Sequence, residues 1–105
     1  MSRSSTITDP DWLENVHAGG LLLSEFMEPL DLSTAELARS VNVDAARIEA
    51  VVRGSLPMDA ELDLRLTRYF RMSEGFFLRL QNDYETLEAK RALNGELERI
   101  LPRAA

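Results

Sequence analysis

Arg47 and Arg53 are the side chains in this sequence whose type and placement indicate a specific interaction. Both face outward on a short helix that the sequence predicts after a tight turn. A guanidinium can donate two parallel hydrogen bonds to the edge of a guanine, and it can also bind a phosphate. We predict the first interaction for Arg47 and the second for Arg53. The alternatives are an ion pair of Arg47 with Asp44 or Glu49, and a solvated surface charge at Arg53.

Catalysis and metal binding have few candidate residues. His17 is the only histidine in the sequence, and there is no cysteine. No carboxylate lies at ligand spacing from His17, so we expect neither a metal site nor a nucleophile paired with a base. Gly19 and Gly20 are not followed by the Lys and Ser or Thr that a phosphate-binding loop needs. We therefore predict no cofactor, no metal, no catalytic residue and no enzymatic activity.

The helix that carries the two arginines is the second of a closely spaced pair. Ser33 is a good N-cap for the first helix, and Glu36 three residues later completes a capping box. Asn42 tolerates the left-handed conformation that ends this helix. Asp44 can cap the second helix, and Gly54 ends it. This layout is typical of a helix-turn-helix that reads DNA, although helix pairs of this kind also occur in small bundles that bind none.

Apolar residues recur at helical spacing in both helices and predict one buried face. They are Leu37, Ala38 and Val41 on the first helix, Ile48, Val51 and Val52 on the second, and Val43 in the corner between them. The small Ala38 side chain allows the two helices to approach closely. The residues left facing outward on the second helix are Ala45, Ala46, Arg47, Glu49, Ala50 and Arg53.

The rest of the chain predicts more helices and no strand, because it has neither an alternating β-branched run nor a hairpin turn. Pro29 is expected to end a helix over residues 18–28. The other expected elements are a short helical turn after Asp9-Pro10 that includes Trp12, a helix from Met58-Asp59 to Phe70, a helix opened by Ser73 and Glu74, and an amphipathic extension over residues 83–101 that breaks at Asn94-Gly95.

Composition is that of an ordinary globular protein, with 105 residues, 45% apolar residues and 29% charged residues. The net charge of −6 argues against nonspecific coating of nucleic acid. The excess acid lies outside residues 33–71, where six arginines balance six acids. The sequence has no signal peptide pattern and no apolar run of the ~20 residues that span a membrane. We therefore expect a cytoplasmic protein that has no contact with a membrane.

Several segments of the sequence resemble one family of regulators. They are His17 to Ser33 (HAGGLLLSEFMEPLDLS), Thr34 to Arg39 (TAELAR), Arg47-Ile48, Leu64 to Phe70 (LRLTRYF) and Ser73 to Gln81 (SEGFFLRLQ). Over residues 17–84 the chain is similar to the HigA antitoxin family, within the Cro and phage-repressor-like transcription regulators. The resemblance implies an all-α, five-helix lambda-repressor-like helix-turn-helix domain, here with an extra C-terminal helix. It also implies that His17 opens the first helix, in a capping or packing role.

The function that the resemblance implies is that of an antitoxin in a type II toxin-antitoxin pair. Such a protein binds operator DNA as a homodimer, represses its own operon and neutralises a ribonuclease toxin. The family usually has polar or basic residues where this chain has Ala45 and Ala46, and Asn where it has Glu49. Alanine can contact only a thymine methyl, and glutamate can accept from a cytosine amine. The alternative function is therefore a protein-interaction module that keeps the fold and binds a partner without reading DNA.

These considerations predict three parts and two surfaces. The parts are an N-terminal arm with a short helical turn (1–16), the helix-turn-helix domain (17–81) and a C-terminal amphipathic helix (82–105). The expected DNA-binding residues are Ser33, Thr34, Ala45, Ala46, Arg47, Glu49 and Arg53. The expected dimer interface consists of Phe76, Phe77, Leu80, Tyr84 and Leu87.

Overall fold

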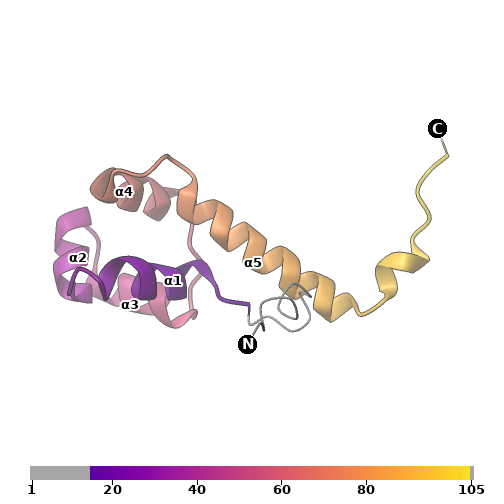
Figure 1. Cartoon of the computed structure of the whole chain (residues 1–105), viewed down its shortest axis with the longest axis horizontal. Coiled ribbons are helices and arrows are strands. Elements are labelled where there is room, and N and C mark those ends of the chain that lie inside the picture. Colours follow the sequence, from indigo (N-terminus) through magenta and orange to yellow (C-terminus); the bar gives the residue numbers. More distant parts are fainter. Residues whose placement is uncertain (1–14, 105) are drawn as a thin grey trace, which may run out of the picture.

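All the regular secondary structure is helical in the computed structural model, which describes residues 15–104 (Figure 1). No strand occurs in this range, so the predicted all-α class is confirmed. The elements in chain order are α1 (Ala18–Leu21), the π-helix η3 (Leu22–Met27), α2 (Thr34–Val41), α3 (Ala45–Arg53), α4 (Ala60–Phe70), α5 (Phe76–Leu93) and the 3-10 helix η4 (Glu96–Arg99). The helical turn predicted after Asp9-Pro10, with Trp12, lies outside the described residues.

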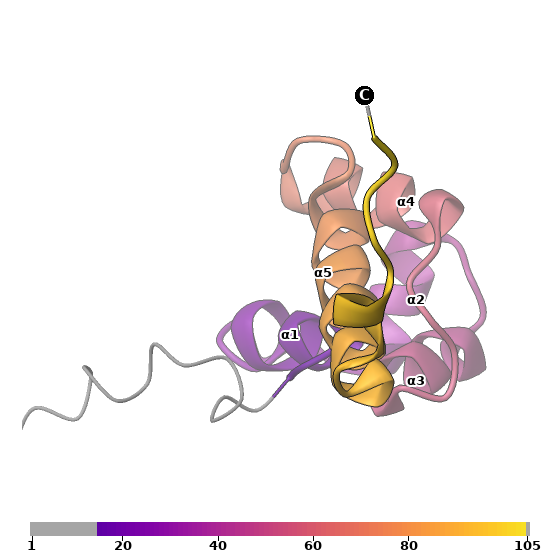
Figure 2. The ribbon, with the colours of Figure 1, turned by 90° about the vertical axis from the view of Figure 1, so that its right-hand side faces the viewer.

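The first four helices gather at one end of α5, and the other end of α5 projects away from them (Figure 1). A view from the C-terminal end of α5 shows these helices behind the tail (Figure 2). The core they enclose consists of Ala18, Leu22, Met27, Leu37, Ala38, Val41, Ile48, Val51, Met58, Leu62, Leu66 and Phe77. The half-buried Phe26 ring extends this core, since its centroid lies 5.1 Å from those of both Phe70 and Phe77.

The caps predicted around the helix pair are present. Ser33 and Glu36 form the complete capping box at the start of α2. Asn42 takes the left-handed conformation (φ 64°) at the end of α2, and Gly54 does so (φ 86°) at the end of α3. Asp44 occupies the N-cap of α3 as expected, but its side chain makes no capping hydrogen bond. The predicted Asp44 cap is therefore confirmed in position and wrong in mechanism.

The start of α5 differs from the prediction. The sequence indicated a helix opened by Ser73, whereas α5 begins after Gly75. The carboxylate that caps it comes from α4: Asp63 accepts hydrogen bonds from the backbone N–H groups of Gly75, Phe77 and Leu78 at 2.7, 2.8 and 3.0 Å. Asp63 is buried, with 1% of its surface exposed. A side chain that is distant in sequence thus replaces the local cap.

The C-terminal helix expected from residue 82 is the second half of α5. Residues 76–93 form one continuous helix, so this expected boundary falls inside it. The helix ends at Asn94 (φ 44°), and Gly95 (φ 92°) follows, which confirms the predicted break. Beyond it, apolar side chains are exposed to solvent at Leu97, Ile100 and Leu101.

Helix η3 has the wider π-helical turn, with the N–H of Glu28 donating to the carbonyl of Leu23 at 2.9 Å. The helical segment ends before Pro29, as predicted. In the described part of the chain, no helix combines the length and the apolar character that a membrane crossing requires.

Candidate nucleic-acid interface

The N-terminus of α2 contains two of the predicted phosphate contacts, Ser33 and Thr34. The Ser33 hydroxyl accepts from the N–H of Glu36 and donates to Glu36 Oε1, both at 3.1 Å. The Thr34 hydroxyl donates to Glu49 Oε2 on α3 at 3.3 Å. Both hydroxyls are thus engaged within the protein. The Thr34 bond also holds a carboxylate beside the helix N-terminus where we predict a phosphate.

The capping box lowers the pKa of the Glu36 carboxyl below its ordinary value of 4.5, first through the Ser33 backbone N–H and then through the Ser33 hydroxyl. A lowered pKa stabilises the fold fully above the ordinary value, and this contribution is lost as the pH falls through the lowered pKa. Glu36→Gln keeps the acceptor oxygen and does not titrate. We expect the stability advantage of the wild type over this variant to shrink below about pH 4.5, measured by urea unfolding between about pH 6 and about pH 3. An advantage that stays constant across this range would contradict the prediction.

Arg47 has different partners from those considered in the sequence. It pairs with neither Asp44 nor Glu49. Its Nη2 lies 3.1 Å from both carboxylate oxygens of Asp59 and 3.3 Å from Glu61 Oε1. Asp59 is the N-cap of α4 and Glu61 lies in its first turn, so Arg47 connects α3 to the start of α4. The ion pair that the sequence offered as the alternative for Arg47 therefore exists, but with other carboxylates.

Glu61 is also linked, through Arg65, to the turn between α2 and α3. Glu61 Oε2 accepts from Arg65 Nη2 at 3.0 Å and from Arg65 Nε at 3.3 Å. Arg65 Nη1 donates to the carbonyls of Val41 and Asn42 at 3.0 and 3.3 Å, where α2 ends. Because these carbonyls have no helical partner of their own, the arginine satisfies acceptors that α2 leaves open. The network fixes α4 against the helix pair.

The remaining predicted residues of α3 divide between surface and core. Ala46, Glu49 and Arg53 are exposed, as predicted. Ala45 was expected to face outward, but it is half-buried and packs against the core. The expectation was wrong there because the first turn of α3 lies against the body of the domain. The exposed surface of α3 therefore has fewer side chains than the sequence indicated.

The residues predicted for a dimer interface lie mostly along the inner side of α5. Phe77 is wholly buried within its own chain, so it does not reach a second copy, and its assignment to the interface is corrected. Phe76 and Leu80 are half-buried and pack against the core. Tyr84 and Leu87 are also half-buried. A contact with a second copy stays a prediction for these four.

His17 has the capping and packing role that the resemblance implies. Its Nδ1 accepts from the N–H of Gly20 at 3.1 Å at the start of α1. Its ring meets that of Tyr84 edge to face at 5.8 Å. A Cβ on Gly54 would lie 2.8 Å from His17 Nε2, so the ring also packs on the end of α3. Within residues 15–104 no three His, Cys, Asp or Glu side chains gather as a metal site would require.

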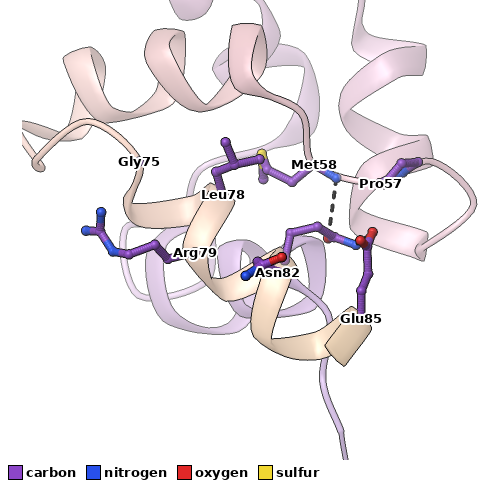
Figure 3. Close-up of a pocket in the computed structure, with 8 residues that line it drawn as sticks. Pro57, Met58, Gly75, Leu78, Arg79, Asn82 and Glu85 are labelled. Carbon is purple, nitrogen blue, oxygen red and sulfur yellow. Dashed lines mark hydrogen bonds between the residues drawn. The ribbon is translucent and has the colours of Figure 1, made fainter. Parts of the chain in front are cut away.

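A pocket of about 440 Å³ lies between the loop after α3 and α5, and no predicted site residue lines it (Figure 3). Its apolar wall includes Pro57, Met58 and Leu78. The side chain of Gln81 crosses it, accepting from the N–H of Met58 at 3.3 Å and donating to Glu85 at 2.8 Å. These bonds fasten the loop to α5.

Several curated proteins and solved structures are similar to this chain, and no family model matches it. Virulence-associated protein I of Dichelobacter nodosus is 34% identical over 70 residues, which are 67% of this chain and 65% of that protein. The chain thus spans just under two thirds of that relative. The uncharacterized HTH-type transcriptional regulator YbaQ of Escherichia coli K12 is 30% identical over 80 residues, which are 76% of this chain and 71% of YbaQ.

One of the similar solved structures is that of the Pseudomonas aeruginosa antitoxin HigA with the higBA promoter. It is 32% identical in sequence and superimposes with a TM-score of 0.79, covering 88% of this chain and 100% of that one. The chain belongs to the HigA-like family of Xre/Cro-type helix-turn-helix regulators.

Proposed function

We propose that this protein is an antitoxin that binds operator DNA as a homodimer and represses its own operon. The observation that carries the proposal is the likeness to the antitoxin HigA, which was solved with its promoter DNA and covers 88% of this chain. The geometry of the helix pair supports it, because the left-handed Asn42 turns α3 away from α2 and leaves Ala46, Glu49 and Arg53 exposed. Such a role places the protein in the cytoplasm, where operator DNA is found.

In this proposal, the N-terminal half of α3 enters the major groove, as the second helix of such a pair does. Arg47 reads a guanine, Glu49 accepts from a cytosine amine, and Ala46 contacts a thymine methyl. Arg53 binds a phosphate, and the N-terminus of α2 with Ser33 lies against another.

We propose that the subunit contact involves α5 and the segment that follows it. Leu93, Leu97, Ile100 and Leu101 are 39%, 45%, 68% and 83% exposed, and a second copy would shield them from water. A homodimer with two-fold symmetry requires a palindromic operator with half-sites about 34 Å apart, or a multiple of that distance. The proposed toxin partner is a small basic ribonuclease, and the net charge of −6 favours its capture.

The first test is Arg47→Ala. We expect this change to weaken binding to a duplex from the chain's own promoter by about 1–3 kcal/mol, because one base contact is lost. Gel shift or fluorescence anisotropy across a salt series measures the affinity, with a scrambled duplex of equal composition as reference. Arg68→Ala removes an exposed cation of α4, outside the proposed DNA contacts and the proposed subunit contact, so this control should bind as the wild type does. Binding that is weak, insensitive to salt and equal for both duplexes would contradict the proposal.

The second candidate function is the interaction module that binds a partner protein and reads no DNA. The ion pairs of Arg47 with Asp59 and Glu61, together with the exposed carboxylate of Glu49, favour it. Under this function Arg47→Ala leaves capture of the co-expressed toxin intact, and neither the wild type nor the variant prefers the promoter duplex. Under the first function the variant loses the promoter and keeps the toxin.

A further inference from the structure

The Arg47 guanidinium contacts its carboxylate partners through one nitrogen, Nη2. Both oxygens of Asp59 and one oxygen of Glu61 lie within 3.3 Å of Nη2. A guanidinium offers two pairs of parallel N–H groups, one from Nη1 and Nη2 and the other from Nε and Nη2. Nη2 therefore belongs to both pairs. A bidentate contact with guanine uses one of these pairs, so in the observed arrangement the nitrogen common to both pairs is already held by carboxylates.

The two carboxylates are themselves fixed in place. Asp59 Oδ1 also accepts from the N–H of Leu62 at 2.9 Å as the N-cap of α4. Glu61 is also bonded to Arg65, whose guanidinium is anchored to the carbonyls that end α2. Each carboxylate therefore has a second partner besides Arg47. When the contact with Arg47 breaks, the arginine moves and the carboxylates stay in place.

The charges around Arg47 also oppose a duplex. The side chains of Asp59 and Glu61 are 59% and 61% exposed, and that of Arg47 is 27% exposed. A phosphate backbone that approached the first turns of α3 would meet two solvent-facing carboxylates beside a half-buried cation. Exposed ion pairs are weak, so a duplex can displace them, at a cost to its affinity.

We infer that Asp59 and Glu61 compete with DNA for Arg47, and that they thereby set the affinity and the base selectivity of the operator interface. This inference rests on the proposed operator-binding function. The two acids are positioning residues, because they act through Arg47 and contact no base themselves. Arg47 moves from these carboxylates to the guanine when the duplex binds, and the protein without its operator keeps Arg47 withdrawn.

The test is a double variant, Asp59→Asn with Glu61→Gln. Asn is as good an N-cap as Asp, and Gln keeps an acceptor for Arg65, so the fold is retained. We expect the affinity for the promoter duplex to rise about threefold to tenfold, because two exposed ion pairs no longer have to be broken. The gain should be smaller on the scrambled duplex, where Arg47 finds no specific base. Urea unfolding checks that the variant is folded.

The matched control is Glu25→Gln with Glu74→Gln, which removes two exposed acids whose side chains have no hydrogen bond or ion pair in the described structure. Its net charge changes equally, and it should raise the affinity for both duplexes alike, by less than about twofold. The second control repeats Asp59→Asn with Glu61→Gln in an Arg47→Ala chain. There the specific gain should disappear, because the residue through which the acids act is absent.

An unchanged or weaker affinity of the double variant for the promoter duplex would overturn this inference. So would a gain that matches the charge control, or one that persists without Arg47. If the wild type prefers its promoter and the gain is missing, the inference fails alone. If no variant, wild type included, prefers the promoter, the proposed function fails and the inference fails with it.

Discussion

Replacing Asp63 by Ala is expected to lower the free energy of unfolding by about 3 kcal/mol, because the first N–H groups of α5 lose their shared acceptor. The carboxylate receives three backbone hydrogen bonds at 2.7–3.0 Å and is almost completely buried. Water cannot replace it without opening the contact between α4 and α5. The change also leaves a cavity. Urea unfolding followed by circular dichroism measures the loss.

Two comparisons make this prediction specific. Asp63→Asn keeps one carbonyl oxygen as an acceptor, so it should cost clearly less than Asp63→Ala. Asp83→Ala removes an exposed carboxylate from α5 itself, and it should change the stability by no more than about 0.5 kcal/mol. A loss below about 1 kcal/mol for Asp63→Ala would mean that the N-terminus of α5 is satisfied without this side chain.

The role of Asp63 could not be predicted from the sequence, whereas the caps of α2 and α3 could. A capping box joins residues three positions apart, so Ser33 and Glu36 are recognisable without knowing where other helices lie. Asn42 and Gly54 are likewise identified by the left-handed conformation that their residue types tolerate. Asp63 reaches Gly75 and Phe77 across 12 and 14 residues. Only the packing of α4 against α5 brings them together.

The same limit applies to the candidate site. Outward-facing Ala46, Glu49 and Arg53 follow from helical periodicity alone and are found as predicted. The partners of Arg47 do not follow from it. Asp59 and Glu61 lie beyond the loop after α3, on another helix, so nothing in the local pattern distinguishes them from other surface acids. The contacts of these residues with DNA stay predictions, because they depend on a duplex as well as on the fold.

The continuity of α5 could have been predicted from its residue types, which apolar periodicity does not take into account. Residues 76–93 contain neither Gly nor Pro, so no residue between them ends a helix. The first turns pack on the core and later turns extend into solvent, so the apolar pattern changes along one unbroken helix. The expected boundary after residue 81 lies inside this helix, which continues to Leu93. The Asn94-Gly95 pair is the first real stop.

Gly19→Ala is expected to destabilise the protein by about 2–3 kcal/mol, although the same change inside an exposed helix adds stability. A Cβ at Gly19 would lie 1.8 Å from the carbonyl oxygen of Val51 and 3.1 Å from the Cα of Val52. These are backbone atoms of α3, which cannot rotate away as a side chain can. The methyl group therefore forces α1 and α3 apart. In the sequence, Gly19 was considered only as a candidate for a phosphate-binding loop. Its role in packing could not be predicted, because the close approach of α1 to α3 depends on the tertiary fold.

The neighbouring glycine is the control. A Cβ at Gly20 would lie 2.9 Å from Val16 Cγ1, the tip of an exposed side chain that can move, so Gly20→Ala should change the stability by less than about 1 kcal/mol. Urea unfolding of both variants tests the contrast, and equal stabilities would contradict it. Because α1 packs against α3, Gly19→Ala should also weaken binding to the promoter duplex, although Arg47 and Arg53 are unchanged in this variant. Gly20→Ala should leave that binding unchanged, so the pair separates the position of α3 from the chemistry of its exposed surface.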